Sequence, residues 1–266
     1  MKQNLLLLSL FAGLLALGAC GGATSKKTTN ESETMLKSET SLNTLSPAEE
    51  EEGWLLLFNG KDFDGWRGYG RQDIPGAWSI DDNSIKISGS GEGEAGAKDG
   101  GDIIYDNQFK NFELHFEWKV AKGSNSGIFY LGQEVDGQPI WKSSPEYQIL
   151  DNENHLDARL GKDGNRMSAS LYDMIAAKPQ NSNPFDEWNT GAIIVFKGTV
   201  VHMQNDEVVL EYHLWTPEWE QMIDDSKFKG WQEMINAGGD ERQGYIGLQD
   251  HGDDVWFRNI KLKEME

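Results

Sequence analysis

The sequence predicts an all-β fold, a jelly-roll sandwich of two antiparallel sheets with one short helical insertion. Residues 112–120 alternate strictly between apolar and polar or charged side chains over nine positions, which is the period of a half-buried strand. Short apolar runs recur along the chain and are separated by Asp-Asn, Asn-Asp or Gly-rich turn signals, as in sandwiches and jelly rolls. A helical pattern is confined to a single segment, so the strands must build the core.

The predicted elements follow one another along residues 54–266, which hold all ten Trp. This length suits one large β domain without a division in two. The helical insertion spans 216–236: Thr216-Pro217-Glu218 supplies the N-cap and first turn, and Gly238-Gly239 ends it. We predict strands at 54–58, 78–80, 84–87, 102–105, 112–120, 127–131, 147–150, 192–196, 199–204, 207–212, 245–249 and 255–262.

The N-terminus, residues 1–19, has the order of a secretion signal. Lys2 precedes an apolar stretch over residues 5–17, which is too short to remain as a membrane span, and Leu17-Gly18-Ala19-Cys20 follows. Leu, two small residues and Cys resemble the bacterial lipobox, which implies that Cys20 carries a lipid once the signal is removed. An ordinary cleaved signal beside an incidental Cys is the alternative. Cys20 is the only cysteine, so the fold contains no disulfide.

Residues 20–53 are predicted to form a disordered tether, because they are rich in Gly, Ser, Thr and Glu and lack aromatic residues. A flexible coil of this length spans about 30 Å. The residues after Cys20 lack the acidic run that often marks export of a bacterial lipoprotein to the cell surface. We therefore expect an exported, membrane-anchored lipoprotein that faces the periplasm rather than the cell surface.

The charge of the domain limits its partners. Residues 54–266 carry 37 acids against 20 bases, a net charge of −17. Such a surface repels nucleic acid and anionic lipid headgroups. Such a charge suits a neutral substrate, a class that includes small carbohydrates, or a cation, and we expect membrane contact only through the lipid on Cys20.

Strand parity sorts polar side chains onto outward faces, where a curved sandwich can hold a ligand. Apolar neighbours such as Tyr147, Ile149, Ile246 and Leu248 point toward the core, and Gly247 leaves room beside the outward side chains. The outward sets are Glu113, His115, Glu117 and Lys119 on one strand, Glu146 and Gln148 on a second, and Gln249 and His251 on a third.

Seven short motifs in order cover nearly all of residues 54–266. They are Leu57-Phe58-Asn59-Gly60-Lys61 with Gly65-Trp66, Phe112-Glu113-Leu114 with Glu117-Trp118-Lys119, Asn125-Ser126-Gly127-Ile128, Glu146-Tyr147-Gln148-Ile149-Leu150-Asp151, Glu187-Trp188-Asn189, His202 with Asn205, and Gly247-Leu248-Gln249-Asp250-His251-Gly252 followed by Phe257-Arg258-Asn259-Ile260. Together they resemble the 3-keto-disaccharide hydrolase family, common in lipoproteins of gut Bacteroidetes. One mild departure is Ser124, where some relatives have Gly.

The resemblance implies a concanavalin A-like lectin/glucanase jelly roll and cleavage of disaccharides or glycosides whose sugar carries a ketone at C3. That ketone acidifies the hydrogen on C2, so a base can form an enolate that expels the C1 substituent before water adds back. The route needs a base near C2 and a cation or hydrogen-bond donor for the enolate oxygen.

We interpret Glu146 as the base or acid, because partial desolvation raises a carboxyl pKa. Lys119 or Arg258 would stabilise the enolate, and His251 would protonate the leaving oxygen. Further substrate contacts are expected from Glu117, Asn125, Gln148, Asp151, His202, Gln249 and Arg258.

Each catalytic interpretation has a structural alternative. Glu146 can be an ordinary solvated strand residue, and Lys119 can be an ion-pair partner of Glu117 or Glu146. His251 can bond a loop carbonyl. Asn125 can serve its turn, since Asn and Gly favour such backbone.

The sequence leaves open whether the protein binds a divalent metal ion. Glu146, Asp151, His202 and His251 are ligand types, and a divalent ion would stabilise an enolate. No tight ligand spacing such as His-Glu-x-x-His is present. No cofactor is assigned on this basis.

Two other functions compete. A conventional glycosidase would place two carboxylates beside the bond, but the Glu-x-Asp-x-x-Glu run usual in glucanases of this fold is missing. A non-catalytic carbohydrate-binding module would explain the ten Trp, although parity directs most of them inward.

Overall fold

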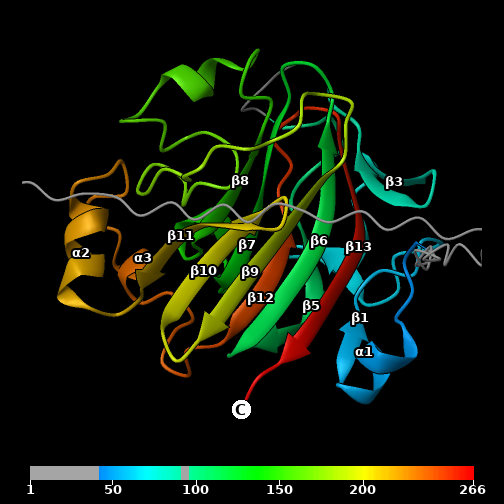
Figure 1. Ribbon diagram of the computed structural model, residues 1–266, viewed down its shortest axis with the longest axis horizontal. Helices are drawn as coiled ribbons and strands as arrows, with labels where there is room; N and C mark the ends of the chain where they lie inside the picture. The colour runs from blue at the N-terminus through cyan, green and yellow to red at the C-terminus, as the bar shows by residue number, and fades with distance from the viewer. Residues whose placement is uncertain (1–41, 91–95) are drawn as a thin grey trace, which may run out of the picture. The chain divides into compact units, whose positions relative to one another are not determined.

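Two antiparallel sheets pack face to face in the computed structural model, which describes residues 42–90 and 96–266 (Figure 1). The larger sheet has the order β11-β10-β9-β6-β13-β4-β3, with β1 added on β13, and the smaller has the order β2-β5-β12-β7-β8. The strands of the larger sheet are β1 (Trp54–Leu56), β3 (Trp78–Asp81), β4 (Ser84–Ile87), β6 (Phe112–Val120), β9 (Asn189–Phe196), β10 (Thr199–Gln204), β11 (Glu207–His213) and β13 (Val255–Glu264). Those of the smaller sheet are β2 (Trp66–Gly68), β5 (Ile103–Phe109), β7 (Asn125–Gly132), β8 (Glu146–Leu150) and β12 (Gly244–Leu248).

The predicted all-β fold is confirmed, and each of the twelve predicted strands is present. β2 is an additional strand, which pairs with β5 through Trp66, Arg67 and Gly68. Three residues are too few to show an alternating pattern, so the sequence alone did not indicate it. The predicted signal peptide and Cys20 lie outside the described residues.

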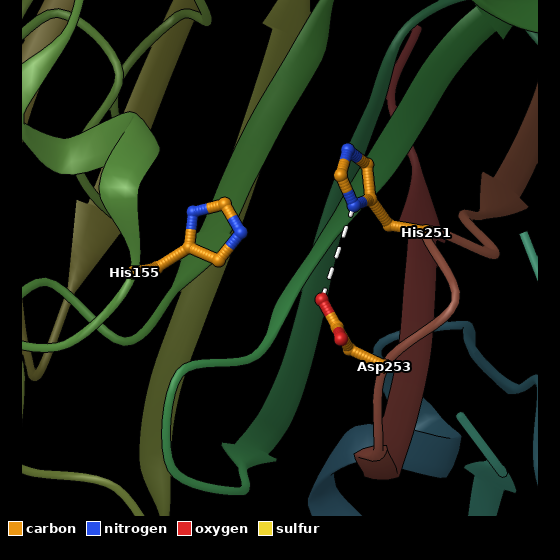
Figure 2. A group of neighbouring side chains, drawn as sticks. All are labelled: His155, His251 and Asp253. Atoms are coloured by element: carbon orange, nitrogen blue, oxygen red, sulfur yellow. Dashed lines mark ion pairs between the residues drawn. The ribbon is translucent and has the colours of Figure 1, made fainter. Parts of the chain in front are cut away.

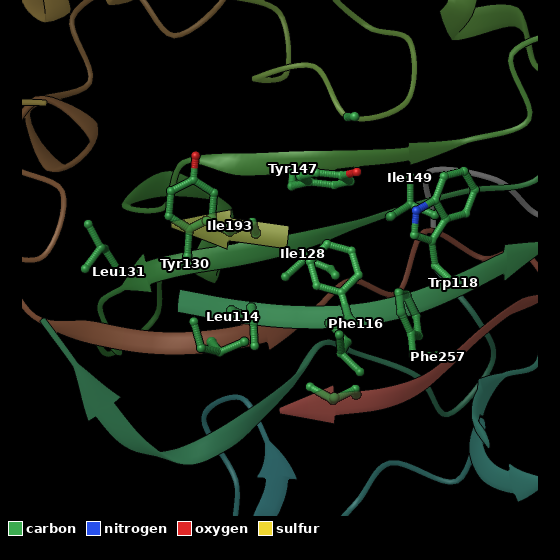
Figure 3. Close-up of a cluster of buried hydrophobic side chains, with 14 of the residues drawn as sticks. Leu114, Phe116, Trp118, Ile128, Tyr130, Leu131, Tyr147, Ile149, Ile193 and Phe257 are labelled. Atoms are coloured by element: carbon green, nitrogen blue, oxygen red, sulfur yellow. The ribbon is translucent and has the colours of Figure 1, made fainter. Parts of the chain in front are cut away.

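The core lies between the sheets and follows from the alternation in β6. Leu114, Phe116 and Trp118 are at most 2% exposed, whereas the intervening polar residues are partly exposed. Their inward side chains meet Tyr130 of β7 and Tyr147 of β8 from the opposite sheet (Figure 3). Full burial of each large apolar side chain stabilises the fold by about 1.5 to 3 kcal/mol.

The predicted helix at 216–236 is two helices, α2 (Pro217–Asp224) and α3 (Gln232–Ile235). Thr216 caps α2 as predicted, with Oγ1 accepting from the Trp219 backbone N–H at 3.2 Å. Gly230, at φ +79°, lies in the left-handed region between them, a backbone conformation that a continuous α-helix cannot contain. The residues between α2 and α3 therefore form a turn, which carries Lys227 and Phe228. None of the helices in the described part of the chain is long and apolar enough to cross a membrane.

The predicted tether is ordered over its last residues, 42–53, so the expectation of coil up to Gly53 is wrong there. These residues include α1 (Pro47–Glu51), which begins with a capping box between Ser46 and Glu49. Asn43 is 4% exposed. Its backbone N–H donates to Oδ1 of Asn259 at 2.6 Å, and the Asn259 N–H donates to Oδ1 of Asn43 at 2.8 Å. This reciprocal pair fixes the segment against β13.

Candidate active site

A cavity of about 420 Å³ opens on the outer face of the smaller sheet. One side is polar, contributed by the strands and the ends of β5 and β12: Asp102, Asn125, Glu146, Gln148, Gln249, Asp250 and His251. The other side is an aromatic row, defined here as Trp141, Tyr172, Phe228 and Trp231, with Lys227 beside it. A site of this size with a few convergent polar groups is the usual form of a small-molecule pocket.

Glu146 lies at the centre of the polar side. It is 8% exposed and belongs to β8, next to Gly127 of β7. A Cβ at position 127 would lie 2.8 Å from Cγ and Cδ of Glu146, so only glycine leaves room for this carboxyl. Burial raises the pKa of Glu146 to about 8, although Lys227 and His251 oppose the rise. With its amide oriented to satisfy both polar atoms, Gln148 donates to Oε1 of Glu146 at 3.1 Å.

Asp102 is a second carboxyl that the sequence analysis missed. Burial raises its pKa to about 7, and it accepts a 2.9 Å bond from the Asp250 backbone N–H. Ile103 pairs with Leu248, so Asp102 lies at the end of β5 beside Gln249. Only the strand pairing reveals this neighbourhood, since 148 residues separate Asp102 from Asp250 along the chain.

Lys227 is the cation of the cavity, and it was also missed. Its Nζ lies 4.1 Å from the ring centroid of Tyr172. The side chain reaches solvent at the rim, but desolvation lowers its pKa while Glu146 opposes the change. Its backbone N–H donates to Oδ2 of Asp173 at 2.8 Å. Arg166 holds that carboxylate at 2.5 Å, which anchors the turn between α2 and α3 over the sheet.

His251 occupies the rim of the polar side, as predicted from parity. Its Nε2 lies 3.2 Å from Nδ2 of Asn125, and its Nδ1 lies 3.9 Å from Oδ2 of Asp253. The Asn125 backbone N–H donates to the same Asp253 oxygen at 3.1 Å. The Asp253 carboxylate therefore holds the Asn125 backbone and lies close to the His251 ring. The structure brings five predicted residues together: Asn125, Glu146, Gln148, Gln249 and His251.

His155, His251 and Asp253 could hold a metal, because one ligand atom from each lies within 4.8 Å of the others (Figure 2). However, Nδ1 of His155 accepts a 3.1 Å bond from the Asp157 backbone N–H. The neutral ring then carries its proton on Nε2, the nitrogen turned toward His251, and presents a donor rather than a ligand. A metal here would have to displace that bond.

The predicted cations Lys119 and Arg258 lie on the other sheet. Lys119 belongs to β6, and its Nζ lies 4.6 Å from the ring centroid of Trp256 and 5.2 Å from that of Trp188. Arg258 of β13 pairs with Glu117 at 2.7 Å. These side chains lie on the outer face of the larger sheet, whereas Glu146 lies on the outer face of the smaller sheet. Lys119, Arg258 and Glu117 are therefore not brought to Glu146.

Asp151 and His202 also lie away from the cavity. Asp151 accepts backbone N–H bonds from Gly123 at 2.7 Å and Glu153 at 3.1 Å, and so fixes a turn. His202 is fully buried between the sheets, where Nε2 accepts from the Tyr130 hydroxyl at 2.8 Å. Asp151 and His202 are therefore not among the predicted substrate contacts that line the cavity, and the suggested ligand set of Glu146, Asp151, His202 and His251 is not assembled.

The chain is similar to known proteins over most of its length. Residues 53–263 match the family described as 3-keto-alpha-glucoside-1,2-lyase-like domain. Over 230 residues the chain is 57% identical to a Bacteroides thetaiotaomicron protein named 3-keto-disaccharide hydrolase, covering 81% of this chain and 79% of that protein.

Solved structures from Parabacteroides distasonis share the fold. One, described as a candidate glycosyl hydrolase, is 27% identical, covers 85% of this chain and 100% of its own, and has a TM-score of 0.73. Another with the same description is 24% identical over 80% of this chain and 99% of its own, with a TM-score of 0.60. The second likeness concerns the fold alone.

Proposed function

The chain belongs to the family of 3-keto-alpha-glucoside-1,2-lyase-like domains, and on that premise we propose that it cleaves 3-keto-disaccharides and other 3-keto-glycosides. The observation that carries the proposal is the buried Glu146 carboxyl, which faces Lys227 and His251 in the cavity. A carboxyl with a pKa near 8 can exchange a proton at neutral to mildly alkaline pH. The name of the relative from B. thetaiotaomicron supports the choice of substrate class.

The proposed reaction begins at C2 of the oxidised sugar. The Glu146 carboxylate removes the C2 proton, and the electron pair moves into the enolate whose oxygen is stabilised by Lys227. The enolate then expels the oxygen on C1, which takes a proton from His251. Water adds across the resulting double bond, with its hydroxyl on C1 and a proton returned to C2.

Lys227 replaces Lys119 and Arg258 in this scheme, because it is the cation that lines the cavity with Glu146. Its pKa is lowered by partial desolvation, while the Glu146 carboxyl opposes this change. Asp102 provides a second carboxyl with a pKa near 7, which is suited to moving protons during the hydration step.

The pH dependence of kcat/KM on a 3-keto-glucoside tests the role of Glu146. As a base, Glu146 acts only when ionised, so we expect kcat/KM to rise with pH up to about 8. Glu146→Gln should lower kcat by about 10²- to 10⁴-fold. Glu207→Gln, which changes an exposed acid on β11, is the matched control and should act like the wild type.

The opposite pH profile would contradict the base assignment. A kcat/KM that falls as pH rises through 8 would make Glu146 the general acid. Absence of aglycone release from any 3-keto-glycoside would overturn the proposed function. Release of an unoxidised nitrophenyl glycoside at the same rate as its 3-keto form would favour a conventional glycosidase instead.

A further inference from the structure

The aromatic row of the cavity is longer than a single sugar ring requires. The ring centroids of Trp141 and Trp231 are 5.3 Å apart, those of Trp231 and Phe228 are 5.0 Å apart, and those of Phe228 and Tyr172 are 6.3 Å apart. The four rings therefore form a continuous apolar surface along one side. A six-membered ring placed at one end leaves the other end uncovered.

The Tyr172 end of the row is next to the proposed chemistry. The Tyr172 backbone N–H donates to the Glu146 carbonyl at 3.2 Å, and Nζ of Lys227 lies over the Tyr172 ring. The hydroxyl of Tyr172 donates to Oδ2 of Asp157 at 2.7 Å, so the ring is held in place. The sugar that is cleaved must lie at this end.

The Trp141 end is exposed and yet rigidly supported. Trp141 is 41% exposed and lies in the 3-10 turn η2 (Ile140–Lys142). Ile140 is fully buried against Phe129, and its carbonyl accepts from the Ser144 hydroxyl at 2.9 Å. A scattered exposed aromatic is ordinary. An indole on an anchored turn, in contact with a second indole at the mouth of a cavity, is a surface already organised for a planar ligand.

We propose that Trp141 and Trp231 bind the leaving group, and that the preferred leaving group is a neutral aromatic ring, as in glucosides of phenols. The inference rests on the proposed function, because it assigns the second half of the same substrate. A glycoside consists of a sugar and a leaving group joined by the bond that breaks, and the aromatic row offers a separate place for each.

The chemistry of the lining residues favours an aryl group over a second sugar. Among the described residues that line the cavity, η2 and the start of α3 contribute only the indoles of Trp141 and Trp231. The side chains able to bond sugar hydroxyls come mainly from β7, β8 and the end of β12. The lining residues at the indole end would offer few hydrogen-bond partners to the hydroxyls of a sugar leaving group. The net charge of −17 on the domain disfavours an anionic leaving group.

Calorimetric binding of unoxidised glucosides tests the aryl site independently of catalysis. The probes are nitrophenyl glucoside in both anomers and methyl glucoside. Trp141→Ala should weaken nitrophenyl glucoside binding about fivefold to tenfold, while Trp141→Phe should stay within about twofold. The matched control, Trp256→Ala, removes an indole from the outer face of the larger sheet and should leave binding unchanged. Methyl glucoside should be bound equally by all variants.

Kinetics on oxidised substrates give the second readout. Trp141→Ala should raise KM for a nitrophenyl 3-keto-glucoside with little change in kcat, because it removes binding common to ground and transition states. The same variant should cleave a 3-keto-disaccharide as the wild type does. An equal loss on the disaccharide, or no loss on the aryl substrate in either assay, would overturn the inference.

The two proposals fail in different ways. If wild-type protein cleaves no 3-keto-glycoside while aryl binding still depends on Trp141, the proposed function fails and the aromatic site stands. If cleavage depends on Glu146 but neither assay responds to Trp141, the proposed function stands and the leaving-group site fails.

Discussion

Glu146 shows how a single residue joins stability and chemistry in this protein. Its carboxyl fits only because residue 127 has no side chain, and burial raises its pKa to about 8. At pH 7 the Glu146 carboxyl keeps its proton in the folded protein. In the unfolded chain, where the pKa of Glu is about 4.5, the same carboxyl is ionised. Glu146 therefore destabilises the fold increasingly as pH rises from 4.5 toward 8.

Lys227 provides the sharpest test at the residue scale. Lys227→Met should lower kcat by about 10²- to 10³-fold, since it removes the charge proposed to stabilise the enolate. Lys229→Met is the matched control, because Lys229 is exposed on the same turn and does not line the cavity. Steady-state kinetics on a 3-keto-glucoside measure both. Equal activity of the two variants would remove Lys227 from the mechanism.

Parity arguments from the sequence predicted the face of each residue correctly but not the sheet. Lys119 and Glu146 both point outward, and a period of two cannot distinguish the outer faces of two opposite sheets. No sequence pattern indicated Lys227, because it lies in the turn that interrupts the predicted helix. Asp102 became visible only when β5 was paired with β12. Local patterns therefore predicted the strands, whereas the pairing of distant strands was needed to bring Asp102 into the site.

At the scale of elements, the N-terminal segment 42–53 is attached to the larger sheet by side-chain bonds. Asn43 has a φ of +55° and donates from Nδ2 to the Asn83 carbonyl at 2.8 Å, besides its reciprocal bonds with Asn259. Glu49 forms an ion pair with Lys261, and Glu52 forms one with Lys263 at 3.0 Å. Composition predicted coil here, because a Glu-rich run is a poor signal of tertiary contact.

Removing the Asn43 side chain tests whether this segment contributes to the fold. Asn43→Gly keeps the positive φ without strain and keeps the bond from its backbone N–H to Asn259. It leaves the Asn259 N–H and the Asn83 carbonyl without their side-chain partner. We expect the free energy of unfolding to fall by about 1 to 3 kcal/mol. Urea denaturation measures it, with the exposed Leu42→Ala as a control expected to change it by less than about 0.5 kcal/mol.

Activity provides the complementary check on Asn43. The segment contacts β13 of the larger sheet, whereas the cavity lies on the outer face of the smaller one. Asn43→Gly should therefore retain wild-type kcat/KM at temperatures where it is folded. If the free energy of unfolding of Asn43→Gly equals that of the wild type, the contacts of residues 42–53 do not stabilise the domain.

For the whole molecule, a buried polar cluster joins the two sheets. The Tyr130 hydroxyl of β7 bonds Nε2 of His202 on β10 at 2.8 Å and the Tyr212 hydroxyl of β11 at 2.6 Å. Nδ1 of His202 donates to the Ala169 carbonyl at 2.9 Å. Burial lowers the pKa of His202 to about 4, so the ring is neutral in the fold. A satisfied network of this kind fixes how the sheets align.

The lowered pKa of His202 makes stability depend on pH in a defined direction. In the unfolded chain the ring takes up a proton below about 6.5, whereas the folded protein resists it down to about 4. This contribution is fully present above pH 6.5 and is lost as pH falls toward 4. It should amount to about 2 to 3 kcal/mol over that range.

Urea denaturation of wild type and His202→Gln between pH 7 and 4 checks this. The variant is expected to be less stable at pH 7, because it breaks the cluster, but to lose about 2 to 3 kcal/mol less on acidification. Subtracting the two curves removes the contribution of carboxylates common to both proteins. Parallel curves would show that His202 does not titrate as a neutral core residue.

The cavity is built from two parts of the chain: the strands of the smaller sheet and the segment around the turn between α2 and α3. Glu146, Gln148 and Asn125 are held by strand pairing, so their positions are inherited with the sandwich itself. The turn carrying Lys227 and Phe228, and Trp231 at the start of α3, attach to the sandwich through a few contacts such as Asp173 with the Lys227 backbone. If Lys227 is kept, an exchange of the other residues of 214–239 between relatives should change the proposed leaving-group preference, while Glu146 stays in place on its strand.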